Sequence, residues 1–370
     1  MKVLHFYKTA LPDTVGGVEQ IINQLARDAS KLGVESHVLS LSSDRVSRTE
    51  TINGYTSHRE RLNFQLASTG FSASAFSRFS QLSKKVDVIH YHFPWPFMDI
   101  VHFVTRVNKP TIVTYHSDII RQKKLLKLYE PIMFRFLSKV DRIVATSPNY
   151  LETSYVLKKF SNKVKVIPIG LDKIDYPGPS IDNENYWRKR VGDKFFLFVG
   201  VLRYYKGLHI LLEAAKNMSY PIVIVGAGPI EQELKVMAIK LNLQNIHFLG
   251  FLPESDKTTL MKLCYSVVFP SHLRSEAFGI SLLEGAMYGK PMISSEIGTG
   301  TTYINIADET GLVVPPSDPV ALRQAMIYLW DNPIMAAKMG VNAQARYLKY
   351  FTANKMVDSY VDLYREIALK

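Results

Sequence analysis

Short runs of apolar residues alternate along the chain with longer stretches of helical apolar spacing. The chain opens on KVLHFY at residues 2–7, and after a turn-rich loop VEQIINQLARDASKLG repeats apolar residues at helical intervals up to Gly33. Further short runs lie at 35–42, 86–93, 110–116 and 140–147. Short apolar runs are typical of parallel strands buried on both faces, and their alternation with helices indicates βαβ units. A doubly wound α/β domain is predicted here.

The same pattern restarts after IPIGLDKIDYPGPSIDNEN, a linker-like segment at 167–185 that is rich in Pro, Gly and Asp. Strands are predicted at 195–200, 220–228, 245–251, 266–271, 289–295 and 310–316, with helices between them. A length of 370 residues also favours two domains. We therefore expect two Rossmann-like domains facing each other across a cleft, at 1–170 and 171–351. A last helix at 352–370 is expected to cross back to the first domain.

Composition indicates an ordered globular protein, with 47% hydrophobic and 21% charged residues. Cys264 is the single cysteine, so neither a disulfide framework nor a cysteine zinc site can form, which fits a reducing compartment. The N-terminus reaches turn residues too early for a signal peptide. No stretch approaches the roughly 20 apolar residues of a membrane span. A cytoplasmic protein is expected.

The net charge of +12 is concentrated in the first half. Residues 1–170 hold 24 Lys and Arg against 13 Asp and Glu, whereas 171–370 hold 21 against 20. This asymmetry predicts an anionic partner for the first half: nucleic acid, phospholipid or a phosphorylated substrate. Nucleic acid is disfavoured, because no zinc finger, helix-turn-helix or aromatic RNA-binding motif is present.

Glycines lie at two junctions between a predicted strand and a helix. Gly16 and Gly17 suit either phosphate binding or an ordinary turn, because glycine lets the backbone approach a ligand and helix amides favour anions. Gly226 opens GAGP, which resembles part of a dinucleotide fingerprint but lacks its third glycine. It favours a tight turn near a nucleotide over an NAD site.

Arg203 and Lys206 follow the predicted strand at 195–200, in the stretch LRYYKG. Open α/β sheets bind ligands at the carboxyl ends of their strands. Two cations there would suit a diphosphate and stabilise it as a leaving group. A solvated basic turn is the alternative.

Two carboxylates, Glu276 and Glu284, flank the start of a predicted helix near Gly279 in SEAFGISLLE. Glu276 follows a strand and Glu284 lies inside the helix, so the two should not face each other as the paired acids of a glycosidase do. A metal site is poorly supported, with only His272 nearby. The pair either binds sugar hydroxyls beside an anion-binding helix terminus or forms two exposed helix charges.

Together and in this order, these segments resemble the retaining GT-B glycosyltransferases of family four, over nearly the whole chain. The resemblance rests on GGVEQIINQLARDASKLG, VTYHSD, FVGVLRYYKGLHILLEAA, IVGAGP, HFLGFLP and EAFGISLLE. LRYYKG and SSEIGTGTTYIN are similar to the bacterial mannosyltransferases that build O-antigen or capsule. The resemblance implies transfer of mannose from GDP-mannose to a lipid-linked or polysaccharide acceptor. A UDP-hexose donor is the alternative, and a sugar-nucleotide epimerase or hydrolase of this fold is a further one.

The resemblance also implies roles for individual residues. Glu276 would bind donor sugar hydroxyls beside the anomeric carbon, and Glu284 would bind the ribose. Lys206 would bind the diphosphate, and His116 would lie near the 6-hydroxyl of the sugar. Backbone groups would complete the site: those of Phe278, Gly279 and Ile280 on sugar and phosphate oxygens, Gly16 and Gly17 where the first domain closes over the diphosphate, and the loop with Phe251 and Leu252 against the base.

One position departs from the family pattern. The family usually places an arginine where this chain has Val201, so either Arg203 reaches the diphosphate from two residues further on or Lys206 carries more of the charge. His90 and His92 alternate on a predicted strand and share a face, but no third zinc ligand is evident, and we place His92 on the acceptor side. The resemblance implies retention by front-face attack. We expect no metal, because fixed cations and helix dipoles would stabilise the leaving diphosphate.

The segment at 117–142 interleaves cations with isoleucine and leucine, and phenylalanines precede it. An anionic bilayer would attract such a surface, which predicts a peripheral protein on the inner face of the cytoplasmic membrane. A helix that packs its apolar side on the sheet and solvates its lysines is the alternative. The residues concerned are Phe64, Phe71, Phe76, Phe79, Arg121, Lys123, Lys124, Lys127, Arg135, Lys139 and Arg142.

Overall fold

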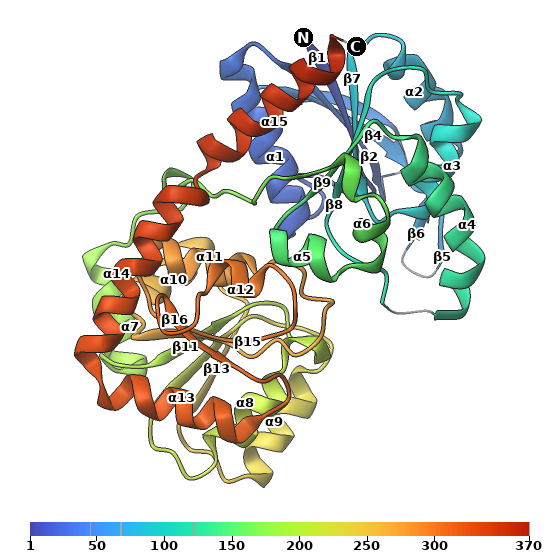
Figure 1. Ribbon diagram of the computed structural model, residues 1–370. Helices are drawn as coiled ribbons and strands as arrows, with labels where there is room; N and C mark the ends of the chain where they lie inside the picture. The colour runs from blue at the N-terminus through green and yellow to red at the C-terminus, as the bar shows by residue number, and fades with distance from the viewer. Residues whose placement is uncertain (45, 67–68, 121–122, 370) are drawn as a thin grey trace. The chain divides into compact units, whose positions relative to one another are not determined.

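A computed structural model describes residues 1–44, 46–66, 69–120 and 123–369, without the side chains of 123 and 124. The predicted cation Arg121 lies outside the described residues, as do the side chains of Lys123 and Lys124. The chain divides into two compact units (Figure 1). Unit 1 comprises Met1–Gly170 and Ala353–Lys370, and unit 2 comprises Leu171–Thr352.

Unit 1 is built on an eight-stranded sheet with the order β10-β9-β8-β7-β1-β2-β4-β3. Every neighbouring pair is parallel except β3 with β4. A separate antiparallel pair joins β5 to β6. The strands are β1 (Lys2–Phe6), β2 (Glu35–Ser42), β3 (Arg48–Ile52), β4 (Tyr55–Arg61), β5 (Phe64–Leu66), β6 (Thr69–Phe71), β7 (Val88–Phe93), β8 (Thr111–Tyr115), β9 (Arg142–Ala145) and β10 (Val164–Val166).

Helices connect β1 to β2 and the strands from β6 to β10, as the alternating pattern predicts, whereas β2 to β6 follow one another with no helix among the described residues. The chain returns to unit 1 in α15, the red helix of Figure 1, which packs against α1. The helices are α1 (Gly17–Ala29), η1 (Ser30–Leu32), α2 (Ala73–Ser83), α3 (Pro96–Val104), α4 (Lys123–Lys139), α5 (Pro148–Thr153), α6 (Tyr155–Lys159), η2 (Ser161–Lys163) and α15 (Ala353–Ala368).

A hairpin at the sheet edge, β3 and β4, was not predicted from the apolar runs. Its turn residues Asn53 and Gly54 both have positive φ, 46° and 89°. An Asn-Gly pair between two strands is the usual signal of such a turn. The outer strand β3 is almost wholly exposed, so it shows no apolar run.

Unit 2 is built on a six-stranded, fully parallel sheet with the order β13-β12-β11-β14-β15-β16. The strands are β11 (Phe196–Val199), β12 (Ile222–Val225), β13 (Ile246–Gly250), β14 (Ser266–Phe269), β15 (Met292–Ser295) and β16 (Gly311–Val314). The helices are η3 (Lys173–Asp175), α7 (Ile181–Val191), η4 (Tyr204–Lys206), α8 (Leu208–Ala215), α9 (Glu231–Lys240), α10 (Glu254–Leu263), α11 (Ile280–Met287), α12 (Thr301–Ile304), α13 (Pro319–Asp331) and α14 (Pro333–Tyr350).

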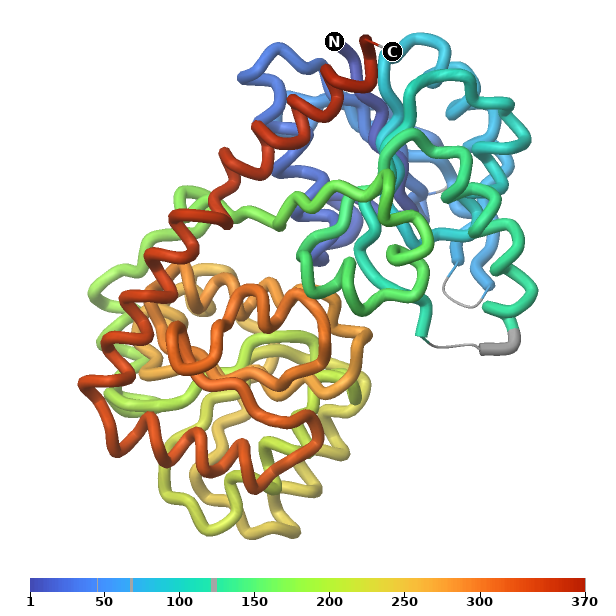
Figure 2. The backbone as a smooth tube through the Cα atoms, in the orientation of Figure 1, coloured from blue at the N-terminus to red at the C-terminus, as the bar shows by residue number. Residues whose placement is uncertain are grey.

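Each of the six strands is predicted by its apolar run. The central strands β11, β12 and β14 are buried along their whole length, as expected for strands covered on both faces. The chain leaves unit 2 after α14 and continues into α15 (Figure 2). Phe351 and Thr352 are the two residues between these helices. Within the described residues, every helix is too short or too polar to cross a bilayer.

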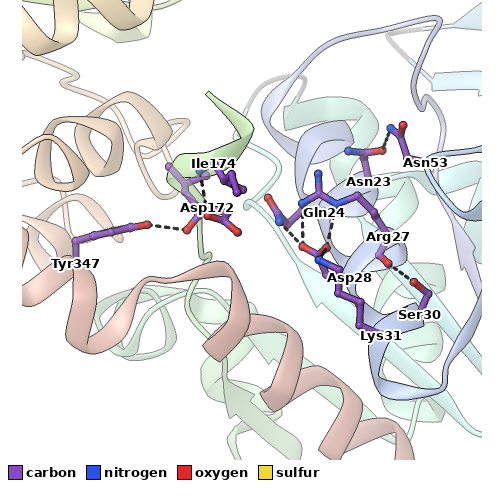
Figure 3. A network of polar contacts seen from close by, with 11 residues as sticks. Asn23, Gln24, Arg27, Asp28, Ser30, Lys31, Asn53, Asp172, Ile174 and Tyr347 are labelled. Carbon is purple, nitrogen blue, oxygen red and sulfur yellow. Dashed lines mark hydrogen bonds and ion pairs between the residues drawn. The ribbon is translucent and has the colours of Figure 1, made fainter. Parts of the chain in front are cut away.

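A polar network fastens the second half of α1 in unit 1 (Figure 3). The buried carboxylate of Asp28 accepts hydrogen bonds from Gln24, Arg27 and Lys31. Burial raises the pKa of Asp28, but these three bonds outweigh it and hold the pKa at about 2. The carboxylate therefore stays ionised and keeps its partners at neutral pH.

Candidate functional site

The strand order of unit 2 reverses at β11. From β11 the chain proceeds to β12 and β13 on one side, and β14, β15 and β16 lie on the other. Open α/β sheets bind ligands at the carboxyl ends of the strands beside such a reversal. Lys206 lies in the loop after β11, and Glu276 lies in the loop after β14. Both predicted residues therefore follow the two strands at the reversal.

Lys206 and Glu276 form an ion pair whose two side chains are 12% and 11% exposed. Ser271 also donates a hydrogen bond of 3.3 Å to the Glu276 carboxylate. Burial is the largest single effect and lowers the pKa of Lys206, but the attraction and hydrogen bond of Glu276 together with Tyr205 outweigh it, so the net pKa is raised. Lys206 is thus a permanent cation at neutral pH, beside a carboxylate.

Gly207 allows the two loops to approach this closely. Its φ is +72°, and a Cβ there would lie 1.9 Å from the carbonyl oxygen of Pro270. Any other residue would push the loop after β11 away from the loop after β14. The ion pair therefore depends on a glycine next to Lys206.

Arg203 extends the positive charge of this loop. Its side chain is exposed. Its positive charge repels that of Lys206 and lowers the pKa of Lys206 slightly. Val201, where the family usually has an arginine, is 51% exposed. A solvated basic turn therefore describes Arg203 in this structure, whereas Lys206 is enclosed.

The helix α11 begins at Ile280, directly after Gly279, whose φ is +96°. No side chain caps this end of the helix. The first amides of a helix have no partner within the helix, and they favour an anion. The side chain of Phe278 is buried, so only backbone groups of this residue can face a ligand.

Glu284 lies inside α11 and is buried. The phenol of Tyr176 donates a hydrogen bond of 3.1 Å to its carboxylate, and Lys257 lies 3.2 Å away. Burial raises the pKa of Glu284 and Glu254 adds to the rise, while Lys257 opposes it. Since Glu276 is also buried, the alternative of two exposed helix charges is wrong.

Tyr176 and Lys257 were not identified from the sequence. Tyr176 follows a turn in which the Asp172 carboxylate accepts from the amide of Ile174, and Tyr347 of α14 donates to the carbonyl of Leu171 beside it (Figure 3). These bonds hold the start of unit 2 where the Tyr176 phenol meets Glu284. Nothing in the sequence around Lys257 on α10 indicates that it pairs with Glu284, because α10 and α11 are brought together only by folding.

Three other predicted positions follow the neighbouring strands β12 and β13 of unit 2. Gly226 follows β12, and its amide donates to the carbonyl of Gly250 with a bond of 2.8 Å. Phe251 comes directly after β13 and is 84% exposed, while Leu252 is half-buried. An exposed aromatic ring after a strand is available to stack on a flat ligand.

Gly16 and Gly17 stand at the start of α1 in unit 1, as predicted, without a capping side chain. Glu19 fills the adjacent space: a Cβ at Gly16 would lie 2.5 Å from its carboxylate, which accepts a bond of 2.6 Å from Thr9. A phosphate at these glycines would lie beside that negative charge. Their predicted place beside a diphosphate stays a prediction.

The sheet of unit 1 also reverses its order, between β1 and β7. His5 lies on β1, His90 and His92 lie on β7, and His116 directly follows β8. His5 Nδ1 lies 3.2 Å from His92 Nε2, and His92 Nδ1 lies 3.0 Å from His116 Nε2. His116 is 7% exposed, whereas the other three are fully enclosed. Among these four histidines, only His116 reaches the surface.

Two predictions about these histidines need correction. His92 is fully buried and both its ring nitrogens are hydrogen-bonded, so it cannot touch an acceptor directly. A third zinc ligand is also available, because ring nitrogens of His5, His90 and His92 lie within 4.8 Å of one another. This third ligand could not be identified from the sequence, because His5 is 85 residues from His90. The two residues become neighbours only through the pairing of β1 with β7. The nitrogens of His90 already bond to Tyr364 and Thr114, each at 2.7 Å.

Comparison with known proteins agrees with this arrangement. A family model described as Glycosyltransferase Family 4 matches residues 15–173, and one described as Glycosyl transferases group 1 matches 181–346. The chain is 62% identical over 353 residues to D-rhamnosyltransferase WbpZ of Pseudomonas aeruginosa, covering 95% of this chain and 93% of that protein. It is 50% identical over 367 residues to O-antigen chain mannosyltransferase C of Escherichia coli, covering 98% of each.

Solved structures share the fold. Sucrose-phosphate synthase from Thermosynechococcus elongatus superposes with a TM-score of 0.82 at 20% identity, covering 99% of this chain and 98% of that one. Anabaena Alr3699/HepE in complex with UDP-glucose gives 0.79 at 18% identity, covering 99% and 100%. The predicted GT-B architecture of two Rossmann-like domains is confirmed. On its sequence and its fold, this chain belongs to the family 4 glycosyltransferases and is a glycosyltransferase.

Proposed function

We propose that the protein transfers a hexose of manno configuration from a guanosine diphosphate sugar to a lipid-linked or polysaccharide acceptor in O-antigen synthesis. The observation that carries the proposal is the buried Lys206–Glu276 pair at the strand reversal of unit 2. The names of the two relatives support the sugar and the pathway, since one transfers mannose in O-antigen chains and the other D-rhamnose.

GDP-mannose is our first choice of donor, and GDP-D-rhamnose is the second candidate. D-rhamnose is mannose without its 6-hydroxyl, so a site that accepts one matches the other at every remaining ring carbon. The relative at 62% identity favours the 6-deoxy sugar, and the one at 50% favours mannose. A UDP-hexose remains the third.

In this proposal, different residues of unit 2 bind different parts of the donor. Lys206, with Arg203 at the surface, binds the diphosphate, and the uncapped start of α11 binds sugar and phosphate oxygens through backbone amides. Glu276 binds hydroxyls of the sugar, and Glu284 accepts from the ribose. Phe251 and Leu252 lie against the base. In unit 1, His116 binds a hydroxyl of the sugar.

The proposed reaction retains the configuration at the anomeric carbon and needs no metal. The cation of Lys206 and the amides of α11 would stabilise the charge that develops on the departing diphosphate. A chelator should leave the rate unchanged. Full inhibition by EDTA that magnesium or manganese reverses would overturn the metal-free part of the proposal and leave the transfer itself standing.

A surface of unit 1 supports a peripheral place on the cytoplasmic face of the membrane. On α4, Leu125, Leu128 and Ile132 are 48%, 77% and 40% exposed, at helical spacing on one face. Arg135 and Lys139 are exposed beside them, Lys127 is exposed elsewhere on the helix, and the helix packs inward through Met133, Phe136 and Leu137. This helix therefore exposes one set of apolar side chains to solvent and packs another against the rest of unit 1. Phe64 and Leu66 on β5 add 58% and 63% exposure, whereas Phe79 lies in the core.

A donor panel tests the proposal. Purified protein is incubated with GDP-mannose, GDP-D-rhamnose or UDP-glucose, with and without a lipid-linked oligosaccharide acceptor, and the products are identified by mass spectrometry. Transfer from one of the GDP sugars that requires the acceptor supports the proposal. A changed sugar nucleotide or free sugar formed at the same rate without acceptor would indicate an epimerase or hydrolase instead.

A further inference from the structure

A row of three hydrogen-bonded imidazoles runs through unit 1 from its core to its surface. His5 bonds to His92, and the other nitrogen of His92 bonds to His116. The rings of His92 and His116 are stacked, with centroids 5.3 Å apart. The row starts at the strand reversal and ends at His116, the ring among these three that is not fully enclosed.

All three rings are neutral at ordinary pH. Burial lowers the pKa of His5 to about 3, and burial with a contribution from Lys8 lowers that of His116 to about 3. Burial also holds the pKa of His92 well below its usual value. A neutral imidazole has one N–H donor and one bare acceptor nitrogen. Fixing the hydrogen on one ring of the row therefore fixes it on all three.

The Nε2 atom of His5 decides between the two arrangements. It is buried and has no hydrogen-bond partner among the described residues. If the hydrogens pointed from His116 toward His5, this atom would carry an N–H with no acceptor, and orphaned buried N–H groups are rarer than unpaired acceptors. In the opposite arrangement, His5 Nδ1 donates to His92 and His92 Nδ1 donates to His116. The buried Nε2 atom of His5 then carries no hydrogen and is only an unpaired acceptor.

We infer that His92 and His5 are positioning residues that hold His116 with its hydrogen on Nδ1, so that His116 donates a hydrogen bond to a substrate oxygen and does not act as a base. Its Nε2 lone pair is engaged by His92, which leaves only the N–H for a ligand. This inference rests on the proposed function for the ligand, in which His116 binds a sugar hydroxyl. The tautomer itself does not depend on it.

Nitrogen-15 NMR of histidine-labelled protein without ligand tests the tautomer directly. The two-bond correlation pattern of His116 should show hydrogen on Nδ1 and a bare Nε2. Hydrogen on Nε2 of His116 in the wild-type protein would overturn the inference, whether or not transfer activity is found. One zinc ion per purified chain that is lost in His5→Phe would overturn it as well, because a metal would take nitrogens from the row.

Two substitutions at His92 separate positioning from packing. In His92→Asn the side-chain amide nitrogen lies close to the position of Nδ1 and can still donate to His116, so the tautomer should persist and kcat should stay within about threefold of wild type. In His92→Leu the donor is lost, His116 should shift toward the Nε2–H form, and kcat should fall about tenfold with little change in donor KM. Equal losses in both variants with an unchanged His116 tautomer would show a packing role only and overturn the inference.

Discussion

Lys257 on α10 pairs with Glu284 on α11 at 3.2 Å, and the same ammonium lies 2.8 Å from Glu254. The two carboxylates differ in their surroundings: the side chain of Glu284 is 6% exposed and that of Glu254 is 41% exposed. A buried carboxylate with one cation and one phenol for partners is held in a fixed orientation. Its exposed neighbour serves as a matched control.

We expect Glu284→Gln to weaken binding of GDP by about tenfold to a hundredfold, because a charged hydrogen bond to the ribose is replaced by a neutral one. Glu254→Gln, which changes the same cation on its exposed side, should alter the affinity by less than about threefold. Titration calorimetry with GDP measures both. An unchanged dissociation constant for Glu284→Gln would remove this residue from the proposed site.

Stability should fall as the pH drops below the ordinary pKa of histidine. His5 and His116 have folded pKa values of about 3 against the usual 6.5, so the unfolded chain binds protons first on acidification. Their contribution to stability is present above pH 6.5 and is lost between there and about pH 3, at about 1.4 kcal/mol per pH unit for each ring.

Urea unfolding at a series of pH values checks this dependence. His5→Phe should show a shallower loss of stability with acid than wild type. The control Phe6→Leu, on the same strand, removes no titrating group and should lower stability by a similar amount at every pH. Parallel curves for wild type and His5→Phe would contradict the assigned burial of a neutral imidazole.

The exposed stripe of α4 predicts binding to anionic liposomes that weakens with salt, since screening reduces the attraction of surface cations. Lys139→Ala should cost about 1 kcal/mol, or roughly fivefold in affinity. Leu128→Ser should weaken binding at low and high salt alike, because it removes apolar contact and not charge. Cosedimentation with anionic and neutral vesicles measures this, and equal affinity for both would favour a merely solvated helix face.

Much of the fold follows from local pattern. Parallel strands that are buried on both faces consist of continuous apolar runs, so all six strands of unit 2 could be predicted from the sequence. The position of Lys206 and Glu276 after strands also follows, because ligand sites of open α/β sheets gather at strand ends, but their ion pair does not. The strand order, which places β11 beside β14, is set by tertiary packing and is not written in any local segment.

Other features depend on contacts between distant segments. The edge strand β3 has almost no buried face and therefore no apolar run. Tyr176 reaches Glu284 across 108 positions, and His5 meets His92 across 87. Nothing near these residues in the sequence distinguishes them from ordinary surface or core positions. The acceptor-side prediction for His92 failed for the same reason, since its burial depends on neighbouring strands.

The central claim, that Glu276 acts on the sugar during transfer, is tested most directly by the rate of Glu276→Gln. With radiolabelled donor and the lipid-linked acceptor, kcat should fall by at least about a hundredfold, since the lost charge acts in the transition state. Affinity for GDP should be unchanged or tighter, because Lys206 loses its competing carboxylate. Thermal unfolding near that of wild type would show that the fold is intact. A kcat within about threefold of wild type in this folded variant would contradict the account.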